Sequence, residues 1–285
     1  MRPEAFFLPA KDGQRFCLFY PAERSSPDGV VRGLVVYIHP FAEEMNKSRR
    51  MAALQSRALA QAGFSVLQID MLGCGDSSGD FGDATWQGWV ADVVQGCRWL
   101  RNRRGTGDAG MDAPPLWLWG LRAGCLLAVA AANELTEGCN FLFWQPPSSG
   151  KALMQQFLRL KVAGVLGGDA KGVMDSLRQA FAAGSSVEIA GYMLSSELAS
   201  GFERAALVPP ARMERASRLE WFEVSTRQDA GLSPVSAATI KHWQQAGFLV
   251  DHHIASGPAF WHTTEIEDAP ALVAATTAVL LMNPA

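Results

Sequence analysis

Hydrophobic runs alternate between strand-like and helix-like stretches along most of the chain. Residues 34–39 and 140–144 form short, continuous apolar runs, as expected for strands buried on both faces of a sheet. Residues 86–104 and 121–135 form longer runs with the length of helices. This alternation is typical of a mostly parallel sheet with helices on both faces, so we predict an α/β protein.

The chain is expected to begin with an antiparallel hairpin, because the β-like runs 5–8 and 15–20 flank an Asp12-Gly13 turn. The other six strands of a predicted eight-stranded sheet are 34–39, 64–70, 116–119, 140–144, 220–224 and 248–254. The helices predicted between and after them are 48–62, 86–104, 121–135, 234–246 and 270–282.

The alternation stops between residues 145 and 218. This stretch holds a mixed helical piece at 151–165 and a β-like piece at 187–192. We interpret it as a cap inserted over the carboxyl edge of the sheet. The predicted division is therefore a core of residues 1–144 and 219–285, with a cap of residues 145–218.

The loop after strand 116–119 has the sequence Gly120-Leu121-Arg122-Ala123-Gly124 and leads directly into an apolar helix. Strand, glycine-flanked sharp turn and helix form the nucleophile elbow of the α/β-hydrolase fold, in which the central residue is usually serine. Arginine stays protonated in proteins, so Arg122 cannot attack a substrate. Two interpretations remain open: Arg122 binds an anion beside the helix N-terminus, or it neutralises Glu43 or Glu44.

The loop after strand 34–39 begins His39-Pro40-Phe41 and continues into two acidic residues, Glu43 and Glu44. In hydrolases of this fold, this loop supplies a backbone donor for the oxyanion. Pro40 has no N–H, so the donor is expected at Phe41 or later. The acidic pair is either an exposed helix start or a partner for Arg122.

An acid and a histidine are expected after the elbow, in that order. Asp229 follows strand 220–224 and is the predicted acid, while His262 follows the last strand and is the predicted histidine. His252 and His253 lie within a strand and are expected to be ordinary strand residues.

Composition and charge narrow the function classes. A net charge of −3 provides no basic surface of the kind that recruits nucleic acid. The apolar stretches 123–132 and 271–282 are too short to span a bilayer, and residues 1–20 lack the features of a signal peptide, so the cytoplasm is the expected compartment. The five cysteines lack metal-ligand spacing, and we predict reduced thiols, no metal site and no cofactor.

Four strings of the chain resemble the exosortase A system-associated hydrolase 2 family, and the resemblance extends from about residue 4 to residue 281. They are 39–50 (HPFAEEMNKSRR), 79–86 (GDFGDATW), 119–122 (WGLR) and 188–192 (EIAGY). The resemblance implies the α/β-hydrolase fold and a place beside bacterial exosortase and exopolysaccharide genes. It also implies that arginine at position 122 is a family feature.

These observations predict a hydrolase of esters or thioesters in which water, rather than a side chain, attacks the substrate. The predicted catalytic residues are Arg122, Asp229 and His262, and the predicted substrate-binding residues are His39, Phe41, Glu43 and Glu44. The attacking water would be activated by Glu43, Glu44 or His262, while Arg122 holds an anionic group. The alternative is a non-catalytic binding or partner protein that uses the same pocket for an anionic small molecule.

Overall fold

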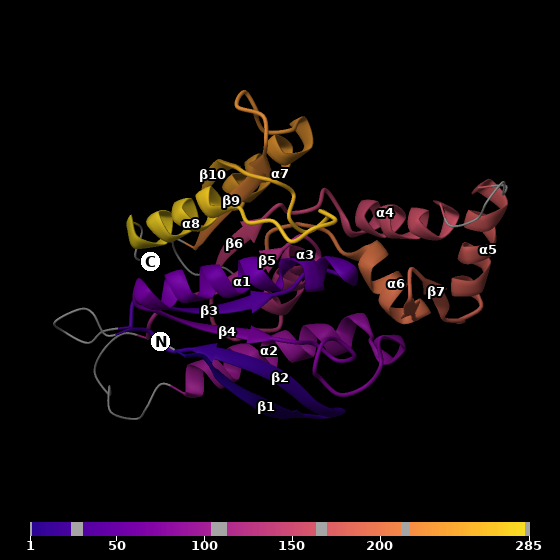
Figure 1. Cartoon of the computed structure of the whole chain (residues 1–285), viewed down its shortest axis with the longest axis horizontal. Coiled ribbons are helices and arrows are strands. Elements are labelled where there is room, and N and C mark those ends of the chain that lie inside the picture. Colours follow the sequence, from indigo (N-terminus) through magenta and orange to yellow (C-terminus); the bar gives the residue numbers. More distant parts are fainter. Residues whose placement is uncertain (1, 24–30, 104–112, 164–169, 212–216, 283–285) are drawn as a thin grey trace.

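A computed structural model describes residues 2–23, 31–103, 113–163, 170–211 and 217–282. Its centre is an eight-stranded sheet with the order β1-β2-β4-β3-β5-β6-β9-β10 (Figure 1). The strands are β1 (Glu4–Ala10), β2 (Gly13–Tyr20), β3 (Gly33–Ile38), β4 (Phe64–Ile69), β5 (Leu116–Leu121), β6 (Asn140–Trp144), β9 (Arg218–Ser225) and β10 (Leu249–Ser256). All eight strands predicted from the sequence are present.

Most of the sheet is parallel. Only β1 and β2, and β2 and β4, pair in antiparallel fashion, whereas β4, β3, β5, β6, β9 and β10 run in one direction. The carboxyl ends of these six strands therefore meet at one edge of the sheet, where loops bring residues from distant parts of the chain together.

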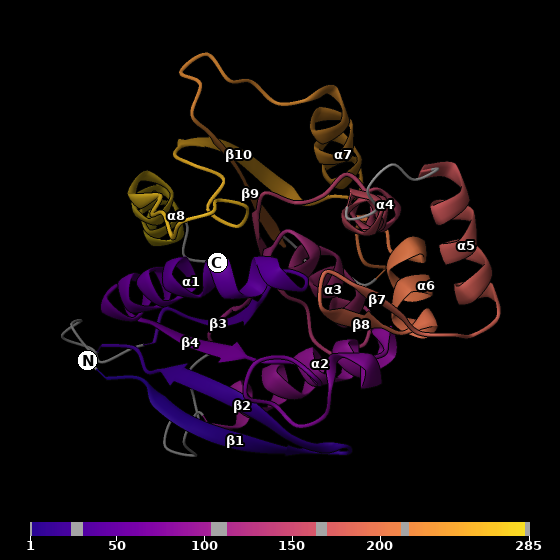
Figure 2. The ribbon, with the colours of Figure 1, turned by 45° about the vertical axis from the view of Figure 1, so that its right-hand side comes forward.

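Helices cover both faces of the sheet. One face carries α1 (Glu43–Gln61) and α8 (Pro270–Met282), which lie side by side (Figure 2). The other face carries α2 (Trp86–Asn102), α3 (Ala123–Ala132) and α7 (Pro234–Gln245). A short 3₁₀ helix, η1 (Phe81–Asp83), precedes α2.

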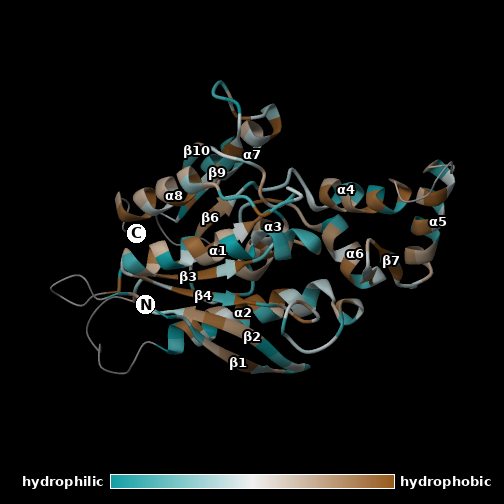
Figure 3. Cartoon of the chain, viewed as in Figure 1, coloured by the Kyte–Doolittle hydropathy of each residue, from teal (hydrophilic) through white to brown (hydrophobic). Residues whose placement is uncertain are grey.

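Two hydrophobic cores result from the alternation of side chains along the strands. In β3, Val36 packs into the core under α2 and α3, while its neighbours Val35 and Tyr37 pack into the core under α1 and α8. Since both faces are covered, β3 and β4 are hydrophobic along most of their length, as Figure 3 shows.

The segment between β6 and β9 forms a separate group of elements at one end of the molecule, to the right in Figure 1. It contains α4 (Gly150–Ala163), α5 (Ala170–Ala182), the hairpin β7 (Val187–Ile189) and β8 (Tyr192–Leu194), and α6 (Ser196–Arg204). The hairpin turn uses Ala190 (φ 50°) and Gly191 (φ 85°), consistent with the left-handed conformations that two-residue hairpin loops favour. The sequence predicted the helical piece and the β-like piece, but not α5 and α6; positions 164 and 165 of the predicted piece lie outside the described residues.

Two predicted helix boundaries differ from the structure by three residues or more. Helix α1 begins at Glu43 rather than at residue 48, because Ala42 takes a strained turn conformation (φ 52°, ψ −127°) that starts the helix early. Helix α3 ends at Ala132, short of the predicted residue 135. Arg104, the predicted end of α2, lies outside the described residues. Within the described part of the chain, every helix is too short or too polar to cross a membrane.

Candidate active site

The turn between β5 and α3 has the shape predicted from its two glycines. Arg122 caps α3 with φ 54° and ψ −118°, a conformation that L residues rarely adopt. A Cβ atom on Gly120 would lie 2.5 Å from the backbone nitrogen of Cys125, and one on Gly124 would lie 2.1 Å from the carbonyl oxygen of Ile38. Glycine is therefore required on both sides of Arg122, and the turn holds the strand and helix backbones in close contact.

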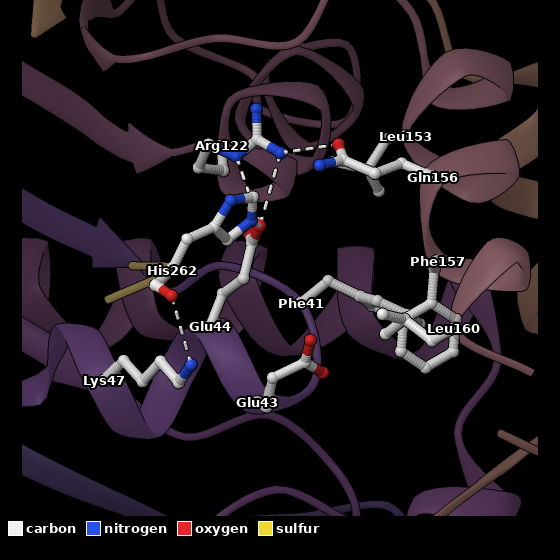
Figure 4. Close-up of a pocket in the computed structure, with 10 residues that line it drawn as sticks. All are labelled: Phe41, Glu43, Glu44, Lys47, Arg122, Leu153, Gln156, Phe157, Leu160 and His262. Carbon is white, nitrogen blue, oxygen red and sulfur yellow. Dashed lines mark hydrogen bonds and ion pairs between the residues drawn. The ribbon is translucent and has the colours of Figure 1, made fainter. Parts of the chain in front are cut away.

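Arg122, Glu44 and His262 form one linked cluster at the carboxyl edge of the sheet (Figure 4). The guanidinium donates to Glu44 Oε1 through Nε at 3.3 Å and through Nη2 at 3.2 Å. His262 Nε2 lies 2.5 Å from the same oxygen. Of the two alternatives for Arg122, the structure thus pairs it with an acidic residue, Glu44, and leaves it on the wall of a pocket.

Glu44 reaches this cluster because the strained turn at Ala42 starts α1 directly after β3. The Glu44 side chain is 9% exposed, and both of its basic partners contact Oε1. Its other oxygen, Oε2, is buried without a hydrogen-bond partner among the described residues. Buried acceptors are usually satisfied, so the arrangement leaves the carboxylate incompletely hydrogen-bonded.

His262 sits in a tight turn after β10, where its N–H donates to the carbonyl oxygen of Ala259 at 2.8 Å. The two residues before it, Phe260 and Trp261, are buried and anchor the turn. A carboxylate oxygen can only accept a hydrogen bond, so Nε2 of His262 is the donor when Glu44 is a carboxylate. The other ring nitrogen, Nδ1, has no hydrogen-bond partner in the described part of the protein.

The cluster lines a pocket of about 340 Å³. Its charged wall comes from the core, and its apolar wall comes mainly from α4 (Figure 4). The lining residues are Phe41, Glu43, Glu44, Lys47, Arg122, Leu153, Gln156, Phe157, Leu160 and His262. Gln156 of α4 connects the two walls, because its Oε1 accepts from Arg122 Nη2 at 3.0 Å.

Of the predicted site residues, Arg122, His262, Phe41, Glu43 and Glu44 all line this pocket. Glu43 belongs to α1, as Glu44 does, and its Oε2 is buried without a partner among the described residues.

His39 does not line the pocket. It is buried below the loop, where Nδ1 donates to the carbonyl oxygen of Pro40 at 2.8 Å and Nε2 accepts from the backbone N–H of Met71 at 3.4 Å. Burial lowers the pKa of His39 below its usual range and so favours the neutral ring. The structure therefore places His39 between two loops, which its ring hydrogen bonds connect, and not on the wall of the pocket.

Asp229 also lies away from the cluster. Its side chain is 79% exposed and pairs with Arg227 of the same loop at 3.1 Å, a contact that lowers the pKa of the Asp229 carboxyl. The predicted Asp229–His262 pairing is absent, because α1 places Glu44 against His262 instead. The sequence indicated Glu44 as a binding residue and as one of three groups that could activate water, but not as the partner of His262.

Cys125 does not provide a substitute nucleophile. It is fully buried behind the turn, where its thiol donates to the carbonyl oxygen of Gly120, and burial raises its pKa well above the usual value. A buried, protonated thiol is inert. Within the described residues, no group of three or more His, Cys, Asp or Glu side chains is placed to hold a metal ion.

The residues that the sequence did not reveal are those of the cap wall and Lys47. Leu153, Gln156, Phe157 and Leu160 follow the helical spacing of α4, which is the only signal they give in the sequence. Lys47 lies one turn after Glu43 on α1, and its Nζ donates to the carbonyl oxygen of His262 at 3.4 Å.

Comparison with known proteins supports the fold. No protein-family model matches the chain. Human protein ABHD12B is 33% identical over 124 residues, which cover 43% of this chain and 30% of the human protein. The match thus spans under a third of that relative's length.

Solved structures of esterases and lipases resemble the whole chain. A thermostable carboxyl esterase from Bacillus coagulans superposes with a TM-score of 0.66 at 13% identity and covers 100% of both chains. Est1E from Butyrivibrio proteoclasticus, solved with ferulic acid, gives 0.64 at 15% identity, with 98% of both chains covered. The monoglyceride lipase of Saccharomyces cerevisiae gives 0.62 at 15% identity, with 98% of this chain and 95% of the lipase covered. The chain has the α/β-hydrolase fold.

Proposed function

We propose that this protein hydrolyses an ester or thioester by direct attack of water, without an acyl-enzyme. The observation that carries the proposal is the hydrogen bond between His262 Nε2 and Glu44 Oε1 on the wall of the pocket. A carboxylate bound to one ring nitrogen orients the imidazole and stabilises its protonated form, which is what a general base requires.

The reaction balances with the groups present. Nδ1 of His262 takes a proton from water while the water oxygen adds to the carbonyl carbon. The resulting tetrahedral intermediate then loses its alkoxide or thiolate, which receives the proton back from His262. The products are a carboxylic acid and an alcohol or thiol.

Arg122 is proposed to stabilise negative charge in this site. Its Nη1 has no partner among the described residues, and it stands at the N-terminus of α3, where the first backbone N–H groups also favour an anion. Arg122 would therefore hold the oxyanion of the intermediate or the carboxylate of the product. Glu44 takes the role for which the sequence suggested Asp229.

The proposal also covers the cap and the cellular context of the protein. Residues 145–218 act as the cap, because α4 supplies one wall of the pocket. The resemblance of strings such as 39–50 to the exosortase A system-associated hydrolase 2 family supports a role in the cytoplasm beside exosortase and exopolysaccharide systems.

The test is hydrolysis of aryl esters and acyl-thioesters by the purified protein. Glu44→Gln and His262→Asn are each expected to lower kcat/KM by about 100-fold or more, the usual effect of removing a general base. Arg122→Ala should lower kcat by about 100-fold. Asp229→Asn serves as the carboxylate comparison and should leave the rate within about twofold. Loss of activity in Asp229→Asn together with full activity in Glu44→Gln would overturn the proposed mechanism.

A second candidate is a binding protein for an anionic small molecule. The observation that favours it is that none of the residues lining the pocket is serine, threonine or cysteine, while Arg122 replaces the usual nucleophile. A thermal-shift screen with phosphate and carboxylate metabolites tests it, because a ligand that binds only the folded state raises its apparent stability. A shift lost in Arg122→Ala, without hydrolysis of any ester, would favour this candidate.

A further inference from the structure

The cap wall of the pocket is a stripe of large apolar side chains on α4. Leu153, Phe157 and Leu160 are spaced by four and three residues, so they lie on one face of the helix, and all three line the pocket (Figure 4). Leu153 and Phe157 are 5% and 6% exposed, whereas Leu160 is 42% exposed. The stripe therefore extends from the closed interior of the pocket toward its mouth.

The apolar wall packs against aromatic side chains of the core and of α6. The ring of Phe157 packs edge-on against Phe41 with centroids 4.8 Å apart, and Phe41 packs in the same way against Phe202 of α6 at 4.8 Å. Phe41 and Phe202 are both buried. The apolar surface is thus part of a packed aromatic cluster that fixes the position of α4.

One polar residue interrupts the stripe and marks where it meets the charged wall. Gln156 lies next to Phe157 on α4 and accepts a hydrogen bond from Arg122. Arg122 and His262 therefore stand at one end of an apolar surface. A ligand that satisfies both walls has a polar carbonyl or carboxylate end and an apolar body.

The volume limits the size of that body. A pocket of about 340 Å³ lies at the small end of the range for small-molecule sites. Leu153 and Leu160 are seven residues apart on α4, which corresponds to about 10 Å along the helix, the length of an extended chain of about eight carbons.

We propose that the pocket binds a straight acyl chain of medium length, with its carboxyl or ester group at Arg122 and His262 and its chain along Leu153, Phe157 and Leu160. The inference rests on the proposed function for the reaction, but the binding of the chain is measured separately. Leu160, at the mouth, is the residue that sets the preferred length.

The binding experiment uses fatty acids as probes and calorimetry as the readout. Octanoate is expected to bind at least tenfold more tightly than acetate, because each methylene buried adds about fourfold to affinity and only part of the chain is fully enclosed. Leu160→Ala should weaken octanoate binding by about three- to tenfold and leave acetate unchanged. Leu249→Ala is the matched control, since Leu249 is 49% exposed but lies at the start of β10, away from the carboxyl edge. Equal affinity for octanoate and acetate, or equal effects of the two leucine variants, would overturn the inference.

The kinetic experiment compares aryl esters with acetyl, octanoyl, palmitoyl and cinnamoyl groups. The highest kcat/KM is expected for the octanoyl ester, at least tenfold above the acetyl ester, and Leu160→Ala should reduce this ratio. Hydrolysis without a chain-length preference, or with cinnamoyl preferred, contradicts the acyl-chain site but not the hydrolase. Octanoate binding with no hydrolysis of any ester contradicts the hydrolase while supporting the acyl-chain site.

Discussion

Two clusters in this protein contain the same three residue types, a glutamate, an arginine and a histidine, but they differ in how the glutamate is used. In the pocket, Arg122 and His262 both contact Oε1 of Glu44, and Oε2 has no partner among the described residues. Between β9 and β10, Arg218 contacts Oε1 of Glu220 at 3.4 Å and His253 contacts Oε2 at 3.0 Å.

The two glutamates differ in burial and in how many of their oxygens have a partner. Glu220 is fully buried with a partner on each oxygen, and Arg218 is held further by Asp251 at 3.0 Å. The strand cluster therefore satisfies both oxygens of its glutamate, while Nε of Arg218 has no hydrogen-bond partner among the described residues. The pocket cluster leaves Oε2 of Glu44 without a partner among the described residues, and it lies on the wall of a cavity, as the proposed function requires.

The largest expected effect is on stability. Glu220→Gln should lower the free energy of unfolding by about 3 kcal/mol, because Glu220 is fully buried and each of its oxygens accepts a hydrogen bond that the substitution weakens or removes. Glu44→Gln should cost about 1 kcal/mol, since Arg122 keeps Gln156 as a partner and borders the pocket. Urea denaturation of both variants measures the difference. Equal losses would show that the two clusters are energetically alike.

A third histidine, His39, can be compared with His262 and His253, because its ring forms no hydrogen bond to a carboxylate. Burial lowers its pKa below the usual 6.5, so below pH 6.5 the unfolded chain binds a proton that the folded protein does not. Stability should therefore fall, by up to about 1.4 kcal/mol per pH unit, as the pH drops from 6.5 toward the pKa of folded His39.

Denaturation curves at several pH values measure this effect. The curve for His39→Gln should lie below that of the unsubstituted protein at pH 7.5 and approach it toward pH 5.5. A constant gap between the two curves across this range would show that His39 does not carry the pH dependence.

The smallest expected effect concerns Ala42, the turn that brings Glu44 to the pocket cluster. Ala42 has a positive φ of 52°, which is strained for any residue except glycine. Ala42→Gly should raise the free energy of unfolding by about 0.5 kcal/mol, because relief of strain slightly exceeds the added entropy of the unfolded chain. Urea denaturation checks the gain. A loss of stability would show that the packing of the Ala42 methyl group outweighs the strain.

Much of the fold could be predicted from local patterns. Strand β3 is a continuous apolar run, so its position along the chain could be predicted. The sharp turn at Arg122 could also be predicted, because the glycines on both sides of it have a clear steric reason. The start of α1 was placed too late, because a strained alanine at position 42 gives no signal in the sequence.

The site was predicted only in part, for physical reasons that differ between residues. The pairing of Arg122 with Glu43 or Glu44 was one of two open interpretations. It was considered because a buried charge needs a partner and these two acidic residues lie in a neighbouring loop of the predicted sheet. Asp229 was assigned because an acid and then a histidine follow the elbow along the chain in α/β hydrolases. That order does not determine the direction of a side chain in an exposed loop. The wall formed by Leu160 and Gln156 depends on how the cap packs on the core, a long-range property that local spacing does not encode.

The bend at residue 122 is set by its neighbours and not by the side chain it carries. Gly120 and Gly124 leave the main chain no room for another course, so exchanging residue 122 changes the chemical group at the apex while the apex itself stays in place. In the Ser–His–Asp triad, Nε2 of the histidine contacts the serine and Nδ1 contacts the acid, whereas Nε2 of His262 contacts Glu44. Serine at position 122 would therefore restore the nucleophile without restoring the triad, which would also require a different orientation of the His262 ring.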